Sequence, residues 1–121
     1  MKARVLFAED QAAIRELFSE VLRREGLSVT SCATAHEACD RIAAEPFDLV
    51  ITDMRMENPR AGYQVIRAAQ KLTHPLPVVL LTAFPIPLAQ LRGYPVAAVV
   101  MKGTALGALL ASVREAVSHV A

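Results

Sequence analysis

The sequence predicts an α/β domain in which a doubly wound, five-stranded parallel sheet carries helices on both faces. Short apolar runs alternate along the chain with stretches whose apolar residues recur every three or four positions. Helical connections between consecutive strands make the strands parallel and the crossovers right-handed. The chain has 121 residues, of which 54% are hydrophobic, which is enough for one core. We therefore expect residues 1–121 to form a single domain.

The first strand is expected at residues 3–8. A helix follows that begins after Asp10, its predicted N-cap, and ends before Gly26. The inner face of this helix is defined by apolar residues at helical spacing: Ile14, Leu17, Phe18, Val21 and Leu22. The second strand is expected at residues 27–32, and its strict apolar–polar alternation is typical of a sheet edge.

A capping box predicts the start of the second helix, with Thr34 as N-cap and Glu37 three residues later. The helix ends before Pro46, and its inner face consists of Ala35, Ala38, Ile42 and Ala43. The third strand lies within residues 47–54. Its centre, Leu49-Val50-Ile51, is apolar and largely β-branched, which predicts burial on both faces.

A third helix is expected after the polar loop of residues 55–62. Its inner face consists of Val65, Ile66, Ala69 and Leu72. The fourth strand follows at residues 77–81. Since both segments keep the order of helix and strand found in the first half, the chain continues as one alternating α/β unit.

The connection after the fourth strand is rich in proline. We expect only about two helical turns there, between Pro87 and Gly93. The fifth strand is expected at residues 96–101. The final helix has Thr104 as its predicted N-cap, and one apolar stripe made of Leu106, Leu109, Leu110, Val113 and Val117.

Composition and charge exclude several classes of function. Charged residues make up 21% of the chain, the formal net charge is +1, and no basic stripe with interleaved aromatic residues is present. We therefore expect no direct binding of nucleic acid. The N-terminus lacks the features of a signal peptide, and no apolar run approaches the ~18 residues of a membrane helix. Cys32 and Cys39 form neither a C-x-x-C motif nor a zinc site, which favours a reducing cytoplasm. Since neither a signal peptide nor a membrane helix is predicted, we expect no membrane contact.

Residues with useful chemistry follow four of the predicted strands. The pair Glu9-Asp10 follows the first, Asp53 ends the third, Thr82 follows the fourth and Lys102 follows the fifth. Since parallel strands end at one edge of a sheet, we expect these side chains to meet there. Converging carboxylates need a cation between them, and oxygen ligands without histidine or cysteine favour a hard ion such as Mg²⁺.

The same residues suit phosphoryl transfer. A carboxylate such as Asp53 can attack phosphorus and form an aspartyl-phosphate. Lys102 and the metal ion can neutralise charge on the phosphoryl oxygens, and the hydroxyl of Thr82 can donate a hydrogen bond to them. The sequence therefore predicts a phospho-acceptor site at the carboxyl edge of the sheet.

This pattern resembles the receiver (CheY-like) domain of two-component response regulators, and the resemblance covers essentially the whole chain. It is carried by Glu9-Asp10, Asp53, Thr82 with the small Ala83 after it, and Lys102, in this order at the strand ends. The resemblance implies a flavodoxin-like fold with strand order 2-1-3-4-5. It also implies a signalling switch that loses its phosphoryl group by slow hydrolysis and is not a metabolic enzyme.

The resemblance also implies the ligands and the partners of the site. Asp53 would accept the phosphoryl group from a sensor histidine kinase or a phosphotransfer protein. Thr82 and Lys102 would then shift the face built from the fourth helix, fifth strand and fifth helix. A downstream protein target, or a second copy in a phosphorylation-dependent homodimer, would bind there. The implied Mg²⁺ ligands are Asp10, Asp53 and the backbone carbonyl of Arg55, with Glu9 acting through water.

The sequence departs from the family pattern in several places. Gly62 comes one residue later than usual, and the connection from Thr82 to Lys102 is short and rich in proline. Glu57 stands where the family usually has proline, Val99 replaces an aromatic residue, and Gly103 replaces the proline after the lysine. We therefore expect intact phosphorylation chemistry with an altered output. The alternative is an atypical receiver that acts as a phosphorylation-independent protein interaction module.

Two further points concern neighbouring functions. Arg55 and Phe84 each lie two residues after a site residue, and we hypothesise that they screen the attacking water and set the lifetime of the phosphoryl group. A nucleotide- or flavin-binding protein is disfavoured, because neither G-x-G-x-x-G nor G-x-x-x-x-G-K-[ST] is present. A phosphatase of the haloacid dehalogenase type is also disfavoured, because it needs a second aspartate two residues after the nucleophile, where this chain has Arg55.

Overall fold

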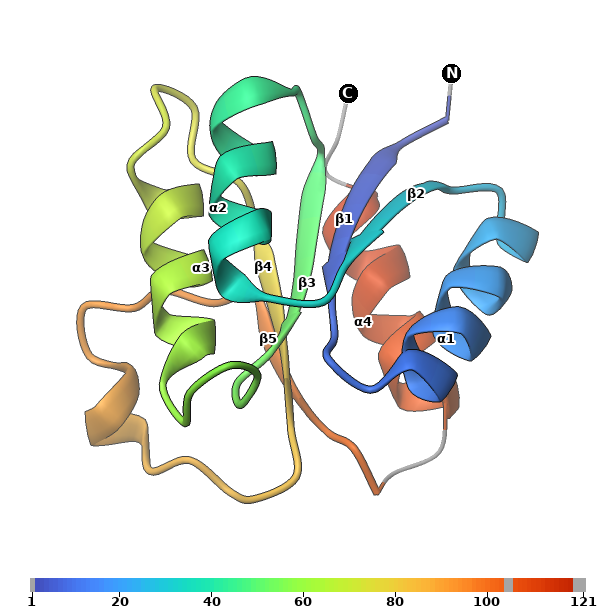
Figure 1. The fold of residues 1–121 in the computed structure, drawn as a ribbon. Helices are drawn as coiled ribbons and strands as arrows, with labels where there is room; N and C mark the ends of the chain where they lie inside the picture. Colours follow the sequence, from blue (N-terminus) through green and yellow to red (C-terminus); the bar gives the residue numbers. More distant parts are fainter. Residues whose placement is uncertain (1, 104–105, 119–121) are drawn as a thin grey trace.

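The computed structural model describes residues 2–103 and 106–118, and its strands form one parallel sheet in the order β2-β1-β3-β4-β5 (Figure 1). The strands are β1 (Arg4–Ala8), β2 (Ser28–Cys32), β3 (Leu49–Asp53), β4 (Val78–Thr82) and β5 (Ala98–Met101). The helices are α1 (Ala12–Arg24), α2 (Ala35–Ala44), α3 (Ala61–Gln70) and α4 (Leu106–Val117), with a 3₁₀ turn η1 at Leu88–Leu91. The predicted sheet and the implied strand order are confirmed.

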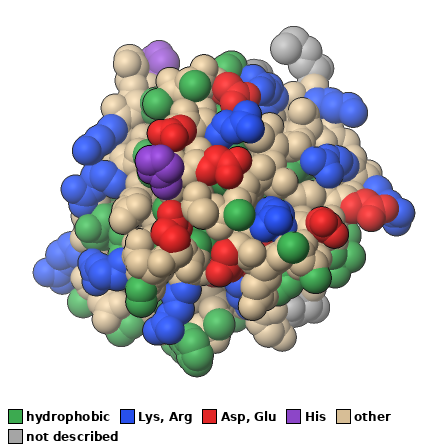
Figure 2. All heavy atoms as spheres, in the orientation of Figure 1, with side chains coloured by type: hydrophobic (Ala, Val, Ile, Leu, Met, Phe, Trp, Pro, Cys, Tyr) green, Lys and Arg blue, Asp and Glu red, His purple; other side chains and the backbone are tan. Residues whose placement is uncertain are grey.

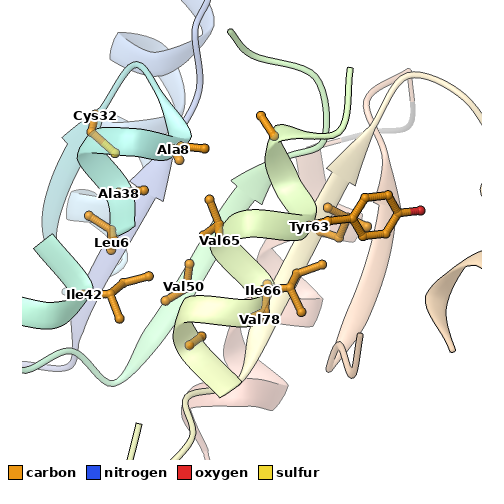
Figure 3. Close-up of a cluster of buried hydrophobic side chains, with 14 of the residues drawn as sticks. Leu6, Ala8, Cys32, Ala38, Ile42, Val50, Tyr63, Val65, Ile66 and Val78 are labelled. Atoms are coloured by element: carbon orange, nitrogen blue, oxygen red, sulfur yellow. The ribbon is translucent and has the colours of Figure 1, made fainter. Parts of the chain in front are cut away.

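Helices cover both faces of the sheet, with α2 and α3 on one face and α1 and α4 on the other (Figure 1). Successive side chains of a strand point to opposite faces, so each strand contributes to two cores. The paired residues Leu6, Val50 and Val78 pack in the α2–α3 layer (Figure 3). Every residue of β3 and β4 is buried, and these central strands therefore fix the edge at which the site lies.

Local capping signals hold at two helix ends and fail at a third. The side chain of Thr34 accepts a hydrogen bond from the N–H of Glu37 at 3.0 Å, as the capping box predicts. Gly26 follows α1 with a φ of +90°, which favours glycine at a helix end. The prediction that Asp10 caps α1 is wrong. Gln11 is the N-cap residue, without a side-chain cap bond, because the Asp10 carboxylate lies among other acids at the sheet edge.

Three residues assigned to inner helix faces lie elsewhere. Leu17 is 57% exposed at the margin of α1, whose contact with the sheet centres on the buried Leu22. Ala43 is exposed on α2, and Leu72 lies beyond the end of α3, where it packs against the core from outside the helix. For each of these three helices, the apolar stripe therefore predicts the buried face correctly except for one residue at its margin.

Gly62 belongs to α3 rather than to the preceding loop, and its lack of a side chain is required there. A Cβ atom added to Gly62 would lie 2.8 Å from the carbonyl oxygen of Asp53 and 2.8 Å from the Cα of Met54. The N–H of Gly62 donates to the Met54 carbonyl at 2.8 Å. The first turn of α3 thus packs directly on the backbone at the end of β3.

The connection between β4 and β5 differs from the prediction. Within residues 83–97 the only helical element is the single turn η1, where two turns were expected. Pro85 and Pro87 lack the N–H that a helix needs, and Gly93 adopts a φ of +82°, so helix cannot extend to either side. The fourth helix that the resemblance implies is therefore not formed in this segment, and α4 takes the place of the implied fifth helix.

Because no helix packs there, the sheet is incompletely covered next to β5. Ile86, Leu91 and Tyr94 pack against the core of the α2–α3 layer, but Val99 remains 41% exposed. A hollow of about 840 Å³ lies between α3, the first residues of β4, α4 and the segment 95–98. The implied output face thus keeps its strand, β5, and its last helix, α4, but lacks the fourth helix, and an open surface lies in its place.

Three smaller predictions have separate outcomes. The edge position of β2 is confirmed, and its residues are mostly half-buried. The predicted N-cap Thr104 lies outside the described residues. The Lys102–Gly103 peptide bond is trans, like every other peptide bond in the described part of the chain. In the same ranges, every helix is too short or too polar to span a bilayer.

Candidate functional site

The carboxyl ends of β1, β3, β4 and β5 bring four predicted site residues to one edge of the sheet. Asp53 and Thr82 are the last residues of β3 and β4, and each is 4% exposed. Glu9 is fully buried directly after β1. Lys102 follows β5, and its N–H donates to the Thr82 carbonyl at 2.8 Å, which extends the pairing of the strands by one residue. The parallel register thus builds the site.

Lys102 is the cation of the site. Its Nζ donates to Asp53 Oδ2 at 2.7 Å and lies 2.8 Å from Glu9 Oε1. Partial burial lowers the pKa of the Lys102 ammonium, but the bonds and charges of Asp53 and Glu9 outweigh this and raise the pKa above its usual value. Lys102 is therefore charged at neutral pH and offsets part of the negative charge of two buried acids.

Three carboxylates form a group that can hold a metal ion. Glu9, Asp10 and Asp53 each offer an oxygen atom within 4.8 Å of the others. Burial raises the pKa of Asp10, as do the hydrogen bond with Glu9 and its charge, whereas the backbone and Lys102 oppose the rise. The group therefore carries a mutual repulsion that a bound cation would relieve.

The carboxylate oxygens of these acids keep lone pairs that can bind a hard cation. Glu9 Oε1 is buried and contacts the Lys102 ammonium at 2.8 Å. The other oxygen, Oε2, accepts from the N–H of Gln11 at 3.2 Å. Asp53 Oδ1 accepts from the N–H of Met54 at 2.9 Å. An all-oxygen donor set with unused lone pairs is the kind that Mg²⁺ prefers.

Thr82 lies at the same edge, but its hydroxyl points elsewhere. Thr82 Oγ1 donates to the Phe84 carbonyl at 2.7 Å and accepts from the Phe84 N–H at 3.2 Å. The hydroxyl is thus engaged in a local turn and makes no bond to Asp53. Five residues were assigned to the site by side chain. The structure brings the side chains of four of them together: Glu9, Asp10, Asp53 and Lys102. The Thr82 hydroxyl is instead bonded to the connection that follows β4.

A cavity of about 490 Å³ opens over these residues. Its walls include Asp10, Asp53 and Lys102, together with Arg55 and Phe84. The Arg55 guanidinium carbon lies 5.6 Å from the centre of the Phe84 ring, within the range of a cation–π contact. Arg55 and Phe84, which follow Asp53 and Thr82 by two positions, therefore contact each other in the wall of this cavity.

Positive charge borders this acidic cavity on the α3 side. Arg60 lies 4.6 Å from the ring centre of Tyr63, and Arg67 lies 4.8 Å from that of Tyr94. The rings of Tyr63 and Tyr94 are 4.5 Å apart and join α3 to the β4–β5 connection. Figure 2 shows several Lys and Arg side chains along the α3 side of the molecule, with others spread over the rest of this face, and acidic side chains nearer α2.

Two sets of contacts beside the site, made by Arg15 and Glu57, were not predicted from the sequence. The Arg15 guanidinium donates to the carbonyl of Glu9 at 2.8 Å and to that of Asp10 at 3.4 Å. Glu57 accepts from the N–H groups of Ala35 and His36 at the start of α2. Burial raises the pKa of Glu57, but these backbone bonds outweigh it and lower the pKa. The replacement of proline by Glu57 was the one available signal for this contact.

The chain is similar to known proteins over nearly its whole length. The family described as "Response regulator receiver domain" matches residues 5–114. Response regulator protein PilR of Pseudomonas aeruginosa is 34% identical over 83 residues, which cover 69% of this chain and 18% of PilR. Sporulation initiation phosphotransferase F of Bacillus subtilis is 29% identical over 84 residues, 69% of this chain and 67% of that protein. The chain therefore spans about a fifth of the longer regulator.

Solved structures show the same fold. The non-phosphorylated HemR receiver domain of Leptospira biflexa matches with a TM-score of 0.87 and 27% identity, over 99% of this chain and 98% of that one. Response regulator TrrA of Thermotoga maritima, solved in complex with Mg²⁺ and BeF, matches with a TM-score of 0.84 and 28% identity, over 96% of this chain and 99% of that one.

Proposed function

Because this chain belongs to the family of response regulator receiver domains, we propose that it is a phospho-acceptor switch in which Asp53 receives the phosphoryl group. The donor is a phosphohistidine of a sensor histidine kinase or of a phosphotransfer protein. The observation that carries the proposal is the contact of Lys102 with Asp53 and Glu9 at 2.7 and 2.8 Å, beside a third carboxylate. We propose that residues 1–121 act as one receiver domain in the cytoplasm.

The geometry of the site supports the following chemistry. A carboxylate oxygen of Asp53 attacks phosphorus, the new O–P bond forms, and the P–N bond to the donor imidazole breaks. Lys102 faces the developing charge on the phosphoryl oxygens from the side of β5. Mg²⁺ would be held by Asp10, Asp53 and the Arg55 carbonyl, with Glu9 through water, and would supply positive charge to those oxygens. In the later hydrolysis, water attacks phosphorus, the O–P bond to Asp53 breaks, and the carboxylate and inorganic phosphate are released.

Thr82 connects this chemistry to the output surface. Its hydroxyl reaches a phosphoryl group on Asp53 only by giving up the bonds to Phe84. Breaking those bonds frees the start of the β4–β5 connection, which carries exposed side chains and only one helical turn. We propose that a downstream protein, or a second copy of the chain, recognises this connection and the open surface beside β5.

The first test is the mass of the intact protein after incubation with acetyl phosphate, with and without Mg²⁺. The expected result is a single phosphoryl adduct that depends on Mg²⁺ and is absent in Asp53→Asn. Labelling that persists at another residue of Asp53→Asn would contradict the assignment.

The second candidate is an interaction module that does not respond to phosphorylation. Val99 in place of an aromatic residue, and the missing helix before it, favour this candidate. Beryllofluoride, which stands in for the phosphoryl group, discriminates between the two. A phosphorylation switch changes the backbone resonances of residues 83–95 when beryllofluoride and Mg²⁺ are added. An interaction module binds its partner equally with and without them.

A further inference from the structure

Glu57 makes a contact that the phosphorylation chemistry does not require. Its carboxylate accepts hydrogen bonds from the backbone N–H groups of Ala35 at 2.8 Å and His36 at 3.0 Å. The next N–H of that turn, from Glu37, is bonded to the side chain of Thr34. The first turn of α2 is therefore capped jointly, by its own N-cap and by a carboxylate that arrives from a distant loop.

This contact anchors the loop that follows Asp53 at Glu57, midway between β3 and α3. At the near end, the N–H of Met54 lies 3.1 Å from a carbonyl of β4 and 2.9 Å from Asp53 Oδ1. Only Arg55 and Met56 lie between these two anchors, and the side chain of Met56 packs against the core of the α2–α3 layer. A span of two residues between fixed ends leaves the backbone of Arg55 little freedom.

We propose that Glu57 is a positioning residue, which holds the Arg55 carbonyl where the metal ion binds. The proposal rests on the proposed function of Asp53 and Mg²⁺. Groups that orient a metal ligand without touching the metal commonly change the metal affinity tenfold or more. The proline usual at this position stiffens a loop through its ring. Glu57 reaches the same end by bonding to a neighbouring helix.

Matched variants separate positioning from general stability. Glu57→Ala removes both bonds to α2, whereas Thr34→Ala removes the other cap of the same turn and leaves the loop attached. Both substitutions destabilise α2. Only Glu57→Ala is expected to weaken Mg²⁺ binding, by about tenfold in a calorimetric titration with MgCl₂.

The charge of Glu57 is tested separately. Glu57→Gln loses the charge but keeps one oxygen that can accept from Ala35 or His36, so an affinity between those of wild type and Glu57→Ala is expected. If only the lost charge mattered, Glu57→Gln and Glu57→Ala would bind Mg²⁺ equally weakly, and the positioning role would be refuted. Equal Mg²⁺ affinity in Glu57→Ala and Thr34→Ala would refute it as well.

A measurement without metal keeps the two proposals apart. The N–H of Met56 donates to the Asn58 carbonyl at 3.2 Å inside the loop. Its hydrogen exchange is expected to be faster in Glu57→Ala than in Thr34→Ala, and equal rates would overturn the positioning role. Failure of the wild-type protein to bind Mg²⁺ would instead overturn the proposed function, and the exchange rates would then decide the role of Glu57 alone.

Discussion

Two segments leave the same edge of the sheet, one after Asp53 and one after Thr82, and they are built in opposite ways. The β3–α3 loop is held by Glu57 at α2 and by the close packing of Gly62 on backbone. The β4–β5 connection has one 3₁₀ turn, and Phe84 within it is 62% exposed. Under the proposed function, the first loop follows the residue that reacts, Asp53, and the second follows the hydroxyl that has to move, that of Thr82.

If the proposed function is correct, this difference assigns phosphoryl transfer to the β3–α3 side of the edge and signalling to the β4–β5 connection. Phosphoryl transfer depends on groups held in a fixed geometry, which the bonded β3–α3 loop supplies. A segment that reports a change needs a low cost of rearrangement, and such segments have few buried apolar contacts. Leu88 in the connection is 86% exposed. We therefore expect substitutions in the first loop to act through stability, metal binding and phosphoryl lifetime, and substitutions in the second to act through signalling and phosphoryl lifetime.

The largest expected effect comes from closing the space at Gly62. Gly62→Ala places a Cβ against backbone atoms of Asp53 and Met54 at 2.8 Å, and the free energy of unfolding should fall by about 2 kcal/mol or more. Gly107→Ala is the control, because nothing lies near an added Cβ there and alanine should stabilise α4 by about 0.5–1 kcal/mol. Urea unfolding measures both. Equal stability of Gly62→Ala and wild type would mean that α3 does not pack closely on β3.

A smaller effect is expected at the opening of the cavity. Arg55→Ala and Phe84→Ala each remove one partner of the contact that covers the site. Water should then reach the phosphoryl group more easily and shorten its lifetime about threefold, or ~0.6 kcal/mol in the barrier. Decay of the phosphoryl adduct by mass measures the lifetime. Leu88→Ala, in the same connection but away from the cavity, should leave it unchanged, and equal lifetimes in all variants would refute the screening role.

The smallest effect concerns the repulsion among the acids. The pKa of Asp10 is raised from 3.8 by burial and by Glu9, so the folded state binds a proton more tightly than the unfolded state. Without metal, this group stabilises the fold at low pH, and the contribution is lost as pH rises through the raised pKa. Asp10→Asn should therefore raise the metal-free unfolding free energy at pH 7, by less than about 1 kcal/mol because Asp10 is exposed.

The same variant should no longer be stabilised by Mg²⁺. The combination of higher metal-free stability and lost metal response is expected of an acid kept for function. Thermal unfolding of wild type and Asp10→Asn at several pH values, with and without MgCl₂, measures both parts. A variant that is less stable than wild type without metal would show that Asp10 serves the fold.

Sequence patterns predict the features that depend on the spacing of apolar residues and on the order of the elements along the chain. The strands and the meeting of Glu9, Asp53 and Lys102 follow from apolar runs that end at one edge of a parallel sheet. Thr34 was predicted correctly because a cap involves neighbours only. Asp10 was predicted wrongly as a cap because an acid after a strand has two possible partners, the helix N-terminus and the other acids, and the sequence does not rank them.

Contacts between distant segments are the part that could not be predicted. Glu57 bonds to residues 21 and 22 positions away, and no local pattern encodes that pairing. The turn that captures the Thr82 hydroxyl depends on the path of the connection after β4. That path is set by prolines, whose effect on helix length was only partly anticipated.

The most direct test of the contrast between the two segments is amide hydrogen exchange of the wild-type protein in three states. These are metal-free, with Mg²⁺, and with Mg²⁺ and beryllofluoride, beside Asp53→Asn as control. We expect beryllofluoride to change exchange mainly in residues 83–95, with little further change in residues 54–62 beyond that caused by Mg²⁺. A response confined to residues 54–62, or one that persists in Asp53→Asn, would contradict the account.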